Sequence, residues 1–418
     1  MKRMLRYGLL VVTLASLALG LSGQAIAETD APAELVAGNN AFAFALYQQV
    51  IANSEGNLIF SPYSISQAFG MVVAGARGDT EQQILDALHF TLPPETLHPT
   101  FGALNADLNS REAPEGVEGQ PLQLNIANSL WGQVDFPFLQ DYLDLLQEAY
   151  SSELNTVDFA ATEEARVAIN DWIEDKTEDK IQDMIPEGAL TPDTRLALVN
   201  AIYFNAGWQN TFAEADTQDD TFTLLDGSAV TVPMMTQEDA FAYWQDEGFQ
   251  VVELAYVGGE TAMLIILPDE GTFADFEATF DAEQFEALRG NIGYAYQPVR
   301  LVMPRFEYAS DIRLNEYLVA LGITDAFSDT AADFSGMYDA NAIEEILYIS
   351  AALHKAFIGV DEAGTEAAAA TAIILGLGGG PAPEPLEVRI DRPFLYVIYD
   401  KVTGSILFMG RTLNPAAE

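Results

Sequence analysis

Side chains that could carry out covalent or metal chemistry are few in this sequence. It has three histidines, His89, His98 and His354, and no cysteine. The histidines do not occur in an H-E-x-x-H or comparable zinc-binding spacing, and no G-x-S-x-G sequence marks a hydrolase nucleophile. The glycine-rich run at 376–380 precedes proline instead of opening a helix, and no acidic run has EF-hand spacing. We therefore predict a protein that is not an enzyme and needs no cofactor or metal.

The residues most unusual in type and spacing lie near the C-terminal end. From Gly364 to Ala372, every side chain except Glu366 is small or β-branched. Alternate positions form one side of a two-residue period: Thr365, Ala367, Ala369 and Thr371. An extended backbone with such side chains could enter between two strands of a sheet without steric conflict.

The next stretch, Gly376–Pro385, contains four glycines and three prolines and cannot be an interior strand or helix. A flexible linker or an exposed loop would explain this composition. However, roughly 30 residues of strand-like sequence follow, with a tight turn at Thr403–Gly404. The loop therefore interrupts a core instead of joining two domains.

Several segments around this loop carry a family resemblance. They are HKAFIGVDE at 354–362, DEAGTEAAAAT at 361–371, DRPFLYVIYD at 391–400 and LFMGRTLNP at 407–415. With further motifs in matching order over residues 36–416, the chain resembles the serpin family, and we expect a secreted, prokaryotic member. The resemblance implies an α+β serpin fold with a large, mainly antiparallel central sheet, further sheets, about eight or nine helices and an exposed reactive-centre loop at about 362–386.

The same resemblance implies the activity. In serpins, a serine protease forms an acyl-enzyme at the loop, the cut loop inserts as a new strand of the central sheet, and the attached protease is distorted. Such a native state would be metastable, because inserting a strand adds hydrogen bonds and buries alternate side chains.

The resemblance assigns roles to two sets of residues. The loop hinge comprises Glu362, Gly364, Thr365, Glu366, Ala367, Ala368, Ala369, Ala370 and Thr371. The sheet-opening region comprises Ser61, Ser64, Asn200, His354, Trp208 and Arg305. In this region, Asn200 is expected to form hydrogen bonds near Ser61, Ser64 and His354. In any fold, a buried asparagine and a core histidine would need hydrogen-bond partners of this kind, so the bonds could equally be structural. Trp208 is expected where the loop begins to insert, and Arg305 is expected to pair with Glu362.

The position of the reactive bond depends on how the loop is counted. Counting from Glu362 at the family's usual hinge length places the cut near 377–379. Counting back from Glu387 and Arg392 places it near Ala382, because the loop is about four residues longer than is common. We predict Leu377–Gly378, since glycine has no side chain to fill a specificity pocket. The alternatives are Gly378–Gly379 and Leu375–Gly376.

The resemblance implies a covalent complex with a serine protease, and leucine before the cut implies that the protease has chymotrypsin-, subtilisin- or elastase-like specificity. The alternative function is a non-inhibitory binding, carrier or structural protein of the same fold, whose loop never inserts. Charged, bulky or proline residues in the hinge would favour that alternative. The hinge between Gly364 and Ala372 carries only Glu366, whose phase puts it on the face opposite Thr365.

Several elements must position these residues. We expect helices over Leu35–Ala52, from Ser61–Pro62 with serine as the cap, over Pro137–Ala149, over Ala165–Pro186 and over Phe273–Arg289. We expect strands over Leu122–Trp131, from Leu196, in several segments between Phe222 and Leu267, and over Val299–Tyr308.

Composition limits the partners. The 418 residues are 49% hydrophobic and carry 18 basic against 63 acidic residues. Residues 1–27 resemble a signal peptide, with Lys2, Arg3 and Arg6 before an apolar run and Ala25-Ile26-Ala27 at its end. Without that segment 15 basic residues remain, and the formal charge becomes −48. We therefore expect a monomeric, acidic, secreted domain at 28–418 that binds neither nucleic acid nor membrane, with the periplasm or the cell surface as alternative locations.

Overall fold

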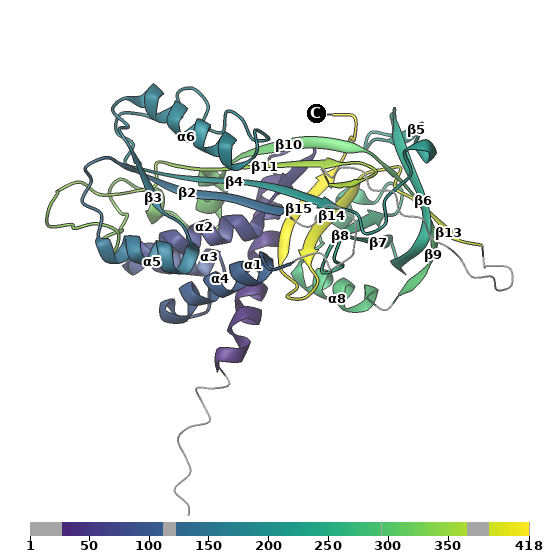
Figure 1. The fold of residues 1–418 in the computed structure, drawn as a ribbon, viewed down its shortest axis with the longest axis horizontal. Coiled ribbons are helices and arrows are strands. Elements are labelled where there is room, and N and C mark those ends of the chain that lie inside the picture. The colour runs from purple at the N-terminus through teal and green to yellow at the C-terminus, as the bar shows by residue number, and fades with distance from the viewer. Residues whose placement is uncertain (1–26, 112–122, 294, 366–383, 418) are drawn as a thin grey trace, which may run out of the picture.

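The computed structural model describes residues 27–111, 123–293, 295–365 and 384–417, and its architecture is the α+β arrangement expected from the sequence. A six-stranded sheet has the order β10-β11-β12-β4-β2-β3, and a larger sheet has the order β1-β15-β14-β8-β7-β6-β9-β13, with β5 paired to β6. Helix α6 lies on one face of the six-stranded sheet, and α1 to α5 lie on the other (Figure 1).

The strands of the six-stranded sheet are β2 (Gln123–Gln133), β3 (Leu154–Val157), β4 (Leu196–Gly207), β10 (Phe306–Arg313), β11 (Ala351–Val360) and β12 (Gly364–Thr365). Those of the larger sheet are β1 (Leu58–Phe60), β5 (Gln218–Thr223), β6 (Ala229–Asp246), β7 (Phe249–Ala255), β8 (Thr261–Pro268), β9 (Tyr296–Pro304), β13 (Leu386–Arg389), β14 (Phe394–Asp400) and β15 (Ile406–Thr412). The described helices are α1 (Ala27–Ile51), α2 (Pro62–Gly75), α3 (Gly78–Ala87), α4 (Pro94–Leu108), α5 (Gln140–Tyr150), α6 (Thr162–Lys176), α7 (Phe273–Glu277), α8 (Ala282–Ile292) and α9 (Leu314–Ala320).

The start of α2 follows directly from its sequence. Ser61 has an extended backbone, and its side chain accepts a hydrogen bond from the Ser64 amide, while Pro62 occupies the first helical position. Almost every residue of α2 is buried, because the helix lies between the six-stranded sheet and the other helices. This placement brings Ser61 and Ser64 beneath β4 and β11.

Helix α1 begins at Ala27 instead of Leu35, and three further elements differ from the sequence prediction in number or end point. The single helix expected over Phe273–Arg289 is two helices, because Asp281 forms a capping box with Gln284 that begins α8. The strand expected over Val299–Tyr308 is divided between the two sheets at Arg305, whose amide donates to Pro233 O at 3.0 Å. Pro304, the last residue of β9, has no amide hydrogen with which to extend the ladder.

The third difference is the length of α6, which ends at Lys176 instead of continuing to Pro186. The Thr177 hydroxyl donates to Ile173 O at 2.8 Å, and Glu178 and Asp179 then adopt left-handed backbone angles. Repeated positive φ values are incompatible with a right-handed helix, so the segment folds back on itself.

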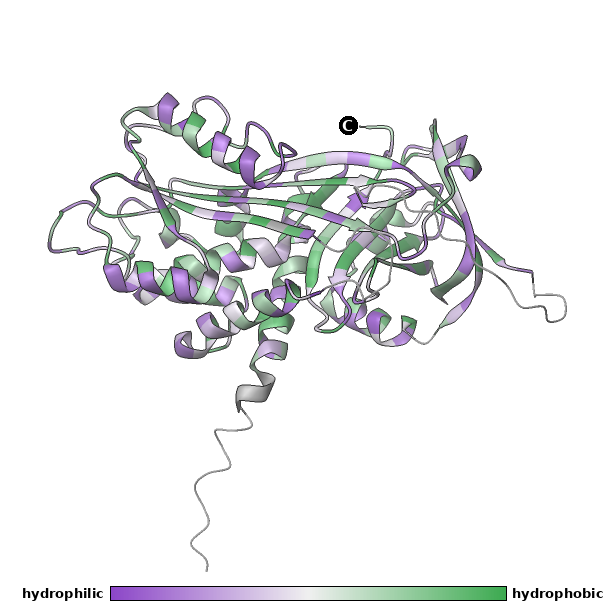
Figure 2. Ribbon diagram, in the orientation of Figure 1, coloured by the Kyte–Doolittle hydropathy of each residue, from purple (hydrophilic) through white to green (hydrophobic). Residues whose placement is uncertain are grey.

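Strands β14 and β15 of the larger sheet are largely hydrophobic (Figure 2). All residues of both strands are buried. Their connecting turn contains Gly404 at φ 81°, a left-handed angle that glycine adopts without strain, as the sequence predicted for a tight turn at this place.

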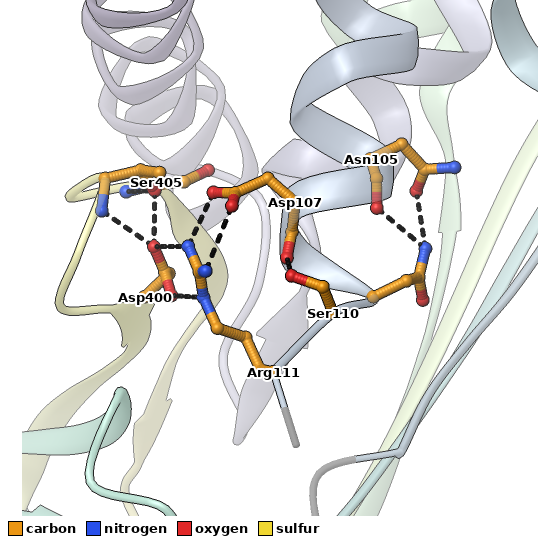
Figure 3. A network of polar contacts seen from close by, with 8 residues as sticks. Asn105, Asp107, Ser110, Arg111, Asp400 and Ser405 are labelled. Carbon is orange, nitrogen blue, oxygen red and sulfur yellow. Dashed lines mark hydrogen bonds and ion pairs between the residues drawn. The ribbon is translucent and has the colours of Figure 1, made fainter.

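A polar network anchors this turn to the end of α4 (Figure 3). The Arg111 guanidinium donates to Asp400 Oδ1 at 2.9 Å and to Asp107 Oδ2 at 2.6 Å. The Asp400 carboxylate also accepts from the Thr403 amide and hydroxyl, both at 2.7 Å. The Asp400 side chain has no solvent exposure, so its charge depends on these donors.

Candidate functional site

The candidate site lies where β12 enters the six-stranded sheet. β12 is antiparallel to both of its neighbours, with Thr365 paired to Val360 on β11 and to Ala206 on β4. Further along, β11 and β4 pair directly with each other in parallel, over Ala351–Phe357 and Ala197–Tyr203. The two strands are therefore separated by β12 at one end and joined along the rest of their length.

A network of backbone and side-chain hydrogen bonds fixes the turn before β12. The Asp361 carboxylate accepts from the Ala363 amide at 2.8 Å and from the Gly364 amide at 3.1 Å. The Trp208 amide donates to Ala363 O at 2.8 Å, and its indole Nε1 donates to Asp361 O at 3.0 Å. Burial raises the pKa of Asp361, although the two amide donors oppose the shift. Trp208 thus lies against the first residues of the hinge.

The next hinge residue, Glu362, forms an ion pair across the two sheets. Arg305 Nε and Nη2 donate to Glu362 Oε1 at 2.8 and 2.5 Å, and the Thr217 hydroxyl contacts the same oxygen. The Glu362 side chain is 7% exposed, whereas that of Arg305 is 41% exposed. Burial raises the pKa of Glu362, but the hydrogen bonds from Arg305 and Thr217 outweigh it and hold that pKa below its usual value.

A second polar cluster lies beneath the directly paired part of β11 and β4. His354 and Asn200 are register partners on the two strands, and His354 Nδ1 contacts Asn200 Oδ1. His354 Nε2 accepts from the Ser61 amide at 3.1 Å, so the ring proton is on Nδ1 and is donated to Asn200. Burial lowers the pKa of His354 to about 3, while the contact with Asn200 works in the opposite direction. The ring is therefore neutral at pH 7.

The rest of this cluster ties α2 to the sheet. Asn200 Nδ2 donates to Ser64 Oγ at 2.7 Å, and Ser64 Oγ donates to Asn128 Oδ1 at 2.9 Å. The Ser61 hydroxyl donates to Leu407 O of β15 at 2.6 Å. Separating β11 from β4 would break the contact between His354 and Asn200, so this cluster resists opening of the sheet.

Sequence reasoning missed three residues of this site: Asn128 on β2, Thr217 after a short 3₁₀ helix, and Tyr256 after β7. The Tyr256 ring stacks on Trp208 with centroids 4.6 Å apart and an interplanar angle of 13°. Its hydroxyl lies 2.8 Å from Thr365 Oγ1. None of them carried a distinctive sequence signal, since Asn128 is one of several polar residues in β2, beside Asn125 and Ser129.

Part of the predicted site lies outside the described residues. These are the hinge residues Glu366, Ala367, Ala368, Ala369, Ala370 and Thr371 and the candidate reactive bonds at Leu375, Gly376, Leu377, Gly378 and Gly379. Over the part of the chain that is described, no group of three or more His, Asp or Glu residues could hold a metal ion. No described helix combines the length and the apolar character needed to span a bilayer.

Known proteins resemble the chain over most of its length. A family model described as serpin (serine protease inhibitor) matches residues 37–415. A serpin-like protein of Thermococcus kodakarensis is 38% identical over 378 residues, covering 90% of this chain and 84% of the relative. Leukocyte elastase inhibitor A of Mus musculus is 37% identical over 397 residues, covering 91% of this chain and all of the relative. The archaeal relative fits the prokaryotic origin expected from the sequence.

Solved structures agree with these relatives. Human kallistatin superposes with a TM-score of 0.82 at 30% identity, covering 93% of this chain and 100% of that one. Human thyroxine-binding globulin in complex with thyroxine gives a TM-score of 0.81, also at 30% identity and with the same coverage of both chains. The serpin fold expected from the sequence is confirmed, and the chain belongs to the serpin family.

Proposed function

We propose that this protein is an exported suicide inhibitor of serine proteases. The observation that carries the proposal is the position of β12, which already occupies the first two residues of a new strand between β11 and β4. The parallel pair ahead of it could be separated to admit more of the hinge. Neither Gly364 nor Thr365 opposes this, because both are small and buried in the sheet.

The proposed reaction begins as ordinary proteolysis. The protease serine Oγ attacks the carbonyl carbon of Leu377, the amide bond to Gly378 breaks, and the new amine of Gly378 leaves with the proton delivered by the protease histidine. The ester formed between Leu377 and the protease is normally hydrolysed by water. Inhibition requires that the hinge insert between β11 and β4 before that hydrolysis, which would carry the attached protease away from its starting position.

The free energy for this step would come from the sheet. One parallel ladder would be replaced by two antiparallel ladders, which adds hydrogen bonds worth about 1 kcal/mol each. Alternate hinge side chains would also be buried. A native state that lacks these interactions is metastable and is held by a kinetic barrier. Cutting the loop removes that barrier and allows the hinge to insert.

Leucine before the cut favours a target of chymotrypsin-, subtilisin- or elastase-like specificity. The mouse relative is named as an inhibitor of leukocyte elastase, which fits that class. Export rests on the signal-peptide pattern of residues 1–27, which would leave a single secreted serpin domain at 28–418. A second candidate is a non-inhibitory binding protein, since thyroxine-binding globulin is a structural neighbour solved with its ligand.

The test is incubation of residues 28–418 with subtilisin, elastase and chymotrypsin at near-equal ratios, followed by denaturing gel electrophoresis and intact-mass analysis. A detergent-resistant species near the summed mass of both proteins would support trapping, and the mass of the released C-terminal peptide would locate the cut. Cleavage within 375–382 by these enzymes, with their activity retained and no such species, would favour the non-inhibitory candidate.

A further inference from the structure

Two buried hydroxyl groups meet at the point where β12 ends. Thr365 Oγ1 and the Tyr256 hydroxyl are 2.8 Å apart, and both side chains have no solvent exposure. Among the described residues, neither hydroxyl hydrogen-bonds to any other group. Within the described residues, the two hydroxyls are therefore each other's only hydrogen-bond partner. Removing either one would leave the other buried and unsatisfied.

The Tyr256 ring is held firmly enough to fix the position of its hydroxyl. One face stacks on Trp208, and Phe204 of β4 contacts the ring edge-on with centroids 5.0 Å apart. Burial raises the pKa of Tyr256, so its hydroxyl stays protonated and available as a donor. Trp208 itself bonds to the turn at Asp361 and Ala363. Tyr256 thus connects Trp208, which contacts the turn before β12, to the side chain of Thr365 in β12.

Thr365 is also at the fork between the two neighbouring strands. It pairs with Val360 on one side and Ala206 on the other, whereas direct pairing of β11 with β4 begins at Phe357 and Tyr203. A hinge that stays at this fork needs only to continue an existing strand when the loop is cut. A hinge that has withdrawn must first find the fork again and lose conformational entropy in doing so.

We propose that Tyr256 is a positioning residue that keeps Thr365 seated between β11 and β4 before the loop is cut. Seating favours insertion over hydrolysis of the acyl-enzyme, so the hydroxyl pair raises the fraction of encounters that end in trapping. This inference rests on the proposed inhibitory function. It assigns to Tyr256 an effect on the outcome of cleavage and none on the rate at which a protease first attacks the loop.

The test compares Tyr256→Phe, Thr365→Val and the double variant with the wild type. The first measurement is the number of inhibitor molecules consumed per protease molecule trapped. Each single variant leaves one buried hydroxyl without its partner and should raise this number at least threefold, with the association rate constant within twofold of wild type. The double variant removes both hydroxyls and should recover most of the loss. Thr365→Ser, which keeps the hydroxyl, should behave as the wild type.

A matched control is Tyr308→Phe. Tyr308 is also buried, and its hydroxyl contacts the Tyr396 hydroxyl at 2.9 Å, Arg411 O at 3.0 Å and the Thr412 hydroxyl at 3.1 Å. If Tyr308→Phe raises the consumed number as much as Tyr256→Phe, the effect is general destabilisation and the proposal is overturned. An unchanged number in Tyr256→Phe overturns it as well.

A second measurement needs no protease and separates this proposal from the proposed function. Hydrogen exchange at the Gly364 and Thr365 amides reports how often the hinge leaves the fork. Tyr256→Phe should accelerate this exchange at least tenfold, and Tyr308→Phe should not. If the wild type traps no protease, the inhibitory function fails, yet faster exchange in Tyr256→Phe would still support the seating role. Equal exchange in Tyr256→Phe and wild type overturns it.

Discussion

His354 and Asn200 face each other across the parallel pairing of β11 with β4, and the Nε2 of the neutral imidazole accepts a hydrogen bond from the Ser61 amide. A second ring proton would be carried by Nε2 and would point at the N–H of the Ser61 amide. Protonation of His354 would therefore break its hydrogen bond with Ser61, so acid should weaken the attachment of the start of α2 to the sheet.

The first prediction concerns this pH dependence. The pKa of His354 is about 3 in the fold and about 6.5 in an unfolded chain, so the unfolded chain binds more protons between these values. The stabilisation is complete above pH 6.5 and is lost as the pH falls toward 3, by at most about 1.4 kcal/mol per pH unit. Melting temperatures between pH 7.5 and 5.5 should show a slope that His354→Gln reduces.

Two histidine variants complete that experiment. Burial lowers the pKa of His98 to about 4, so His98→Gln should reduce the slope in the same direction. His89 is exposed, and His89→Asn serves as the surface control. A slope that His354→Gln does not change would show that the histidine does not couple the sheet to pH.

The second prediction concerns the ion pair at the base of the hinge. Arg305→Gln leaves the Glu362 carboxylate buried with only Thr217 as a side-chain donor. We therefore expect the free energy of unfolding to fall by about 1–3 kcal/mol. The matched variant is Arg300→Gln, because Arg300 is 45% exposed and its pairs with Glu238 and Glu387 are at the surface. Arg300→Gln should lower the free energy of unfolding by less than about 0.5 kcal/mol. Equal melting temperatures for the two variants would contradict the assignment.

The third prediction concerns the entry of the hinge. Thr365→Arg would place a long cation at a position with no solvent exposure between β11 and β4. The hinge should then remain outside the sheet, and the variant should be cleaved as a substrate without forming a covalent complex. Thr279→Arg, at an exposed threonine before α8, is the matched control and should retain trapping. A Thr365→Arg variant that yields wild-type amounts of complex would refute this prediction.

The fourth prediction concerns the network at the end of α4. Arg111→Gln leaves the fully buried Asp400 carboxylate without its cation and should cost about 3–5 kcal/mol. Arg289→Gln also removes an arginine–carboxylate pair, but that pair lies at the surface of α8 and should contribute less than about 1 kcal/mol. Thermal unfolding of both variants measures the difference. A small effect in Arg111→Gln would mean that the Thr403 donors suffice for Asp400.

Local signals predicted local structure well. The serine cap and the proline at 61–62 begin α2, and the glycine at 404 closes the β14–β15 turn, because a single residue type determines each feature. Periodicity could not distinguish one helix from two over Phe273–Arg289, since the apolar spacing continues across the Asp281 cap. Periodicity also could not show that the apolar run Val299–Tyr308 is divided into two strands that belong to different sheets.

The site was predictable only where family motifs marked it. Ser61, Asn200, Trp208 and Arg305 were predicted in that way; the structure places each beside the expected hinge or beneath β11 and β4, and their roles stay predictions. Tyr256 was missed because nothing near it in the sequence distinguishes it from other core tyrosines. Its relation to Thr365 joins residues 109 apart and depends on how β7, β4 and β12 come together.

The position of β14 and β15 determines when this protein can fold during synthesis. These strands follow every other described strand in the sequence, yet β15 pairs with β1, which precedes the others, and the Ser61 hydroxyl reaches Leu407 across 346 residues of sequence. Helix α2 and the cluster around His354 therefore lack their support until the final hairpin has left the ribosome. A nascent chain that stops before β14 should stay unfolded, so the fold forms only after β14 and β15 have been synthesised.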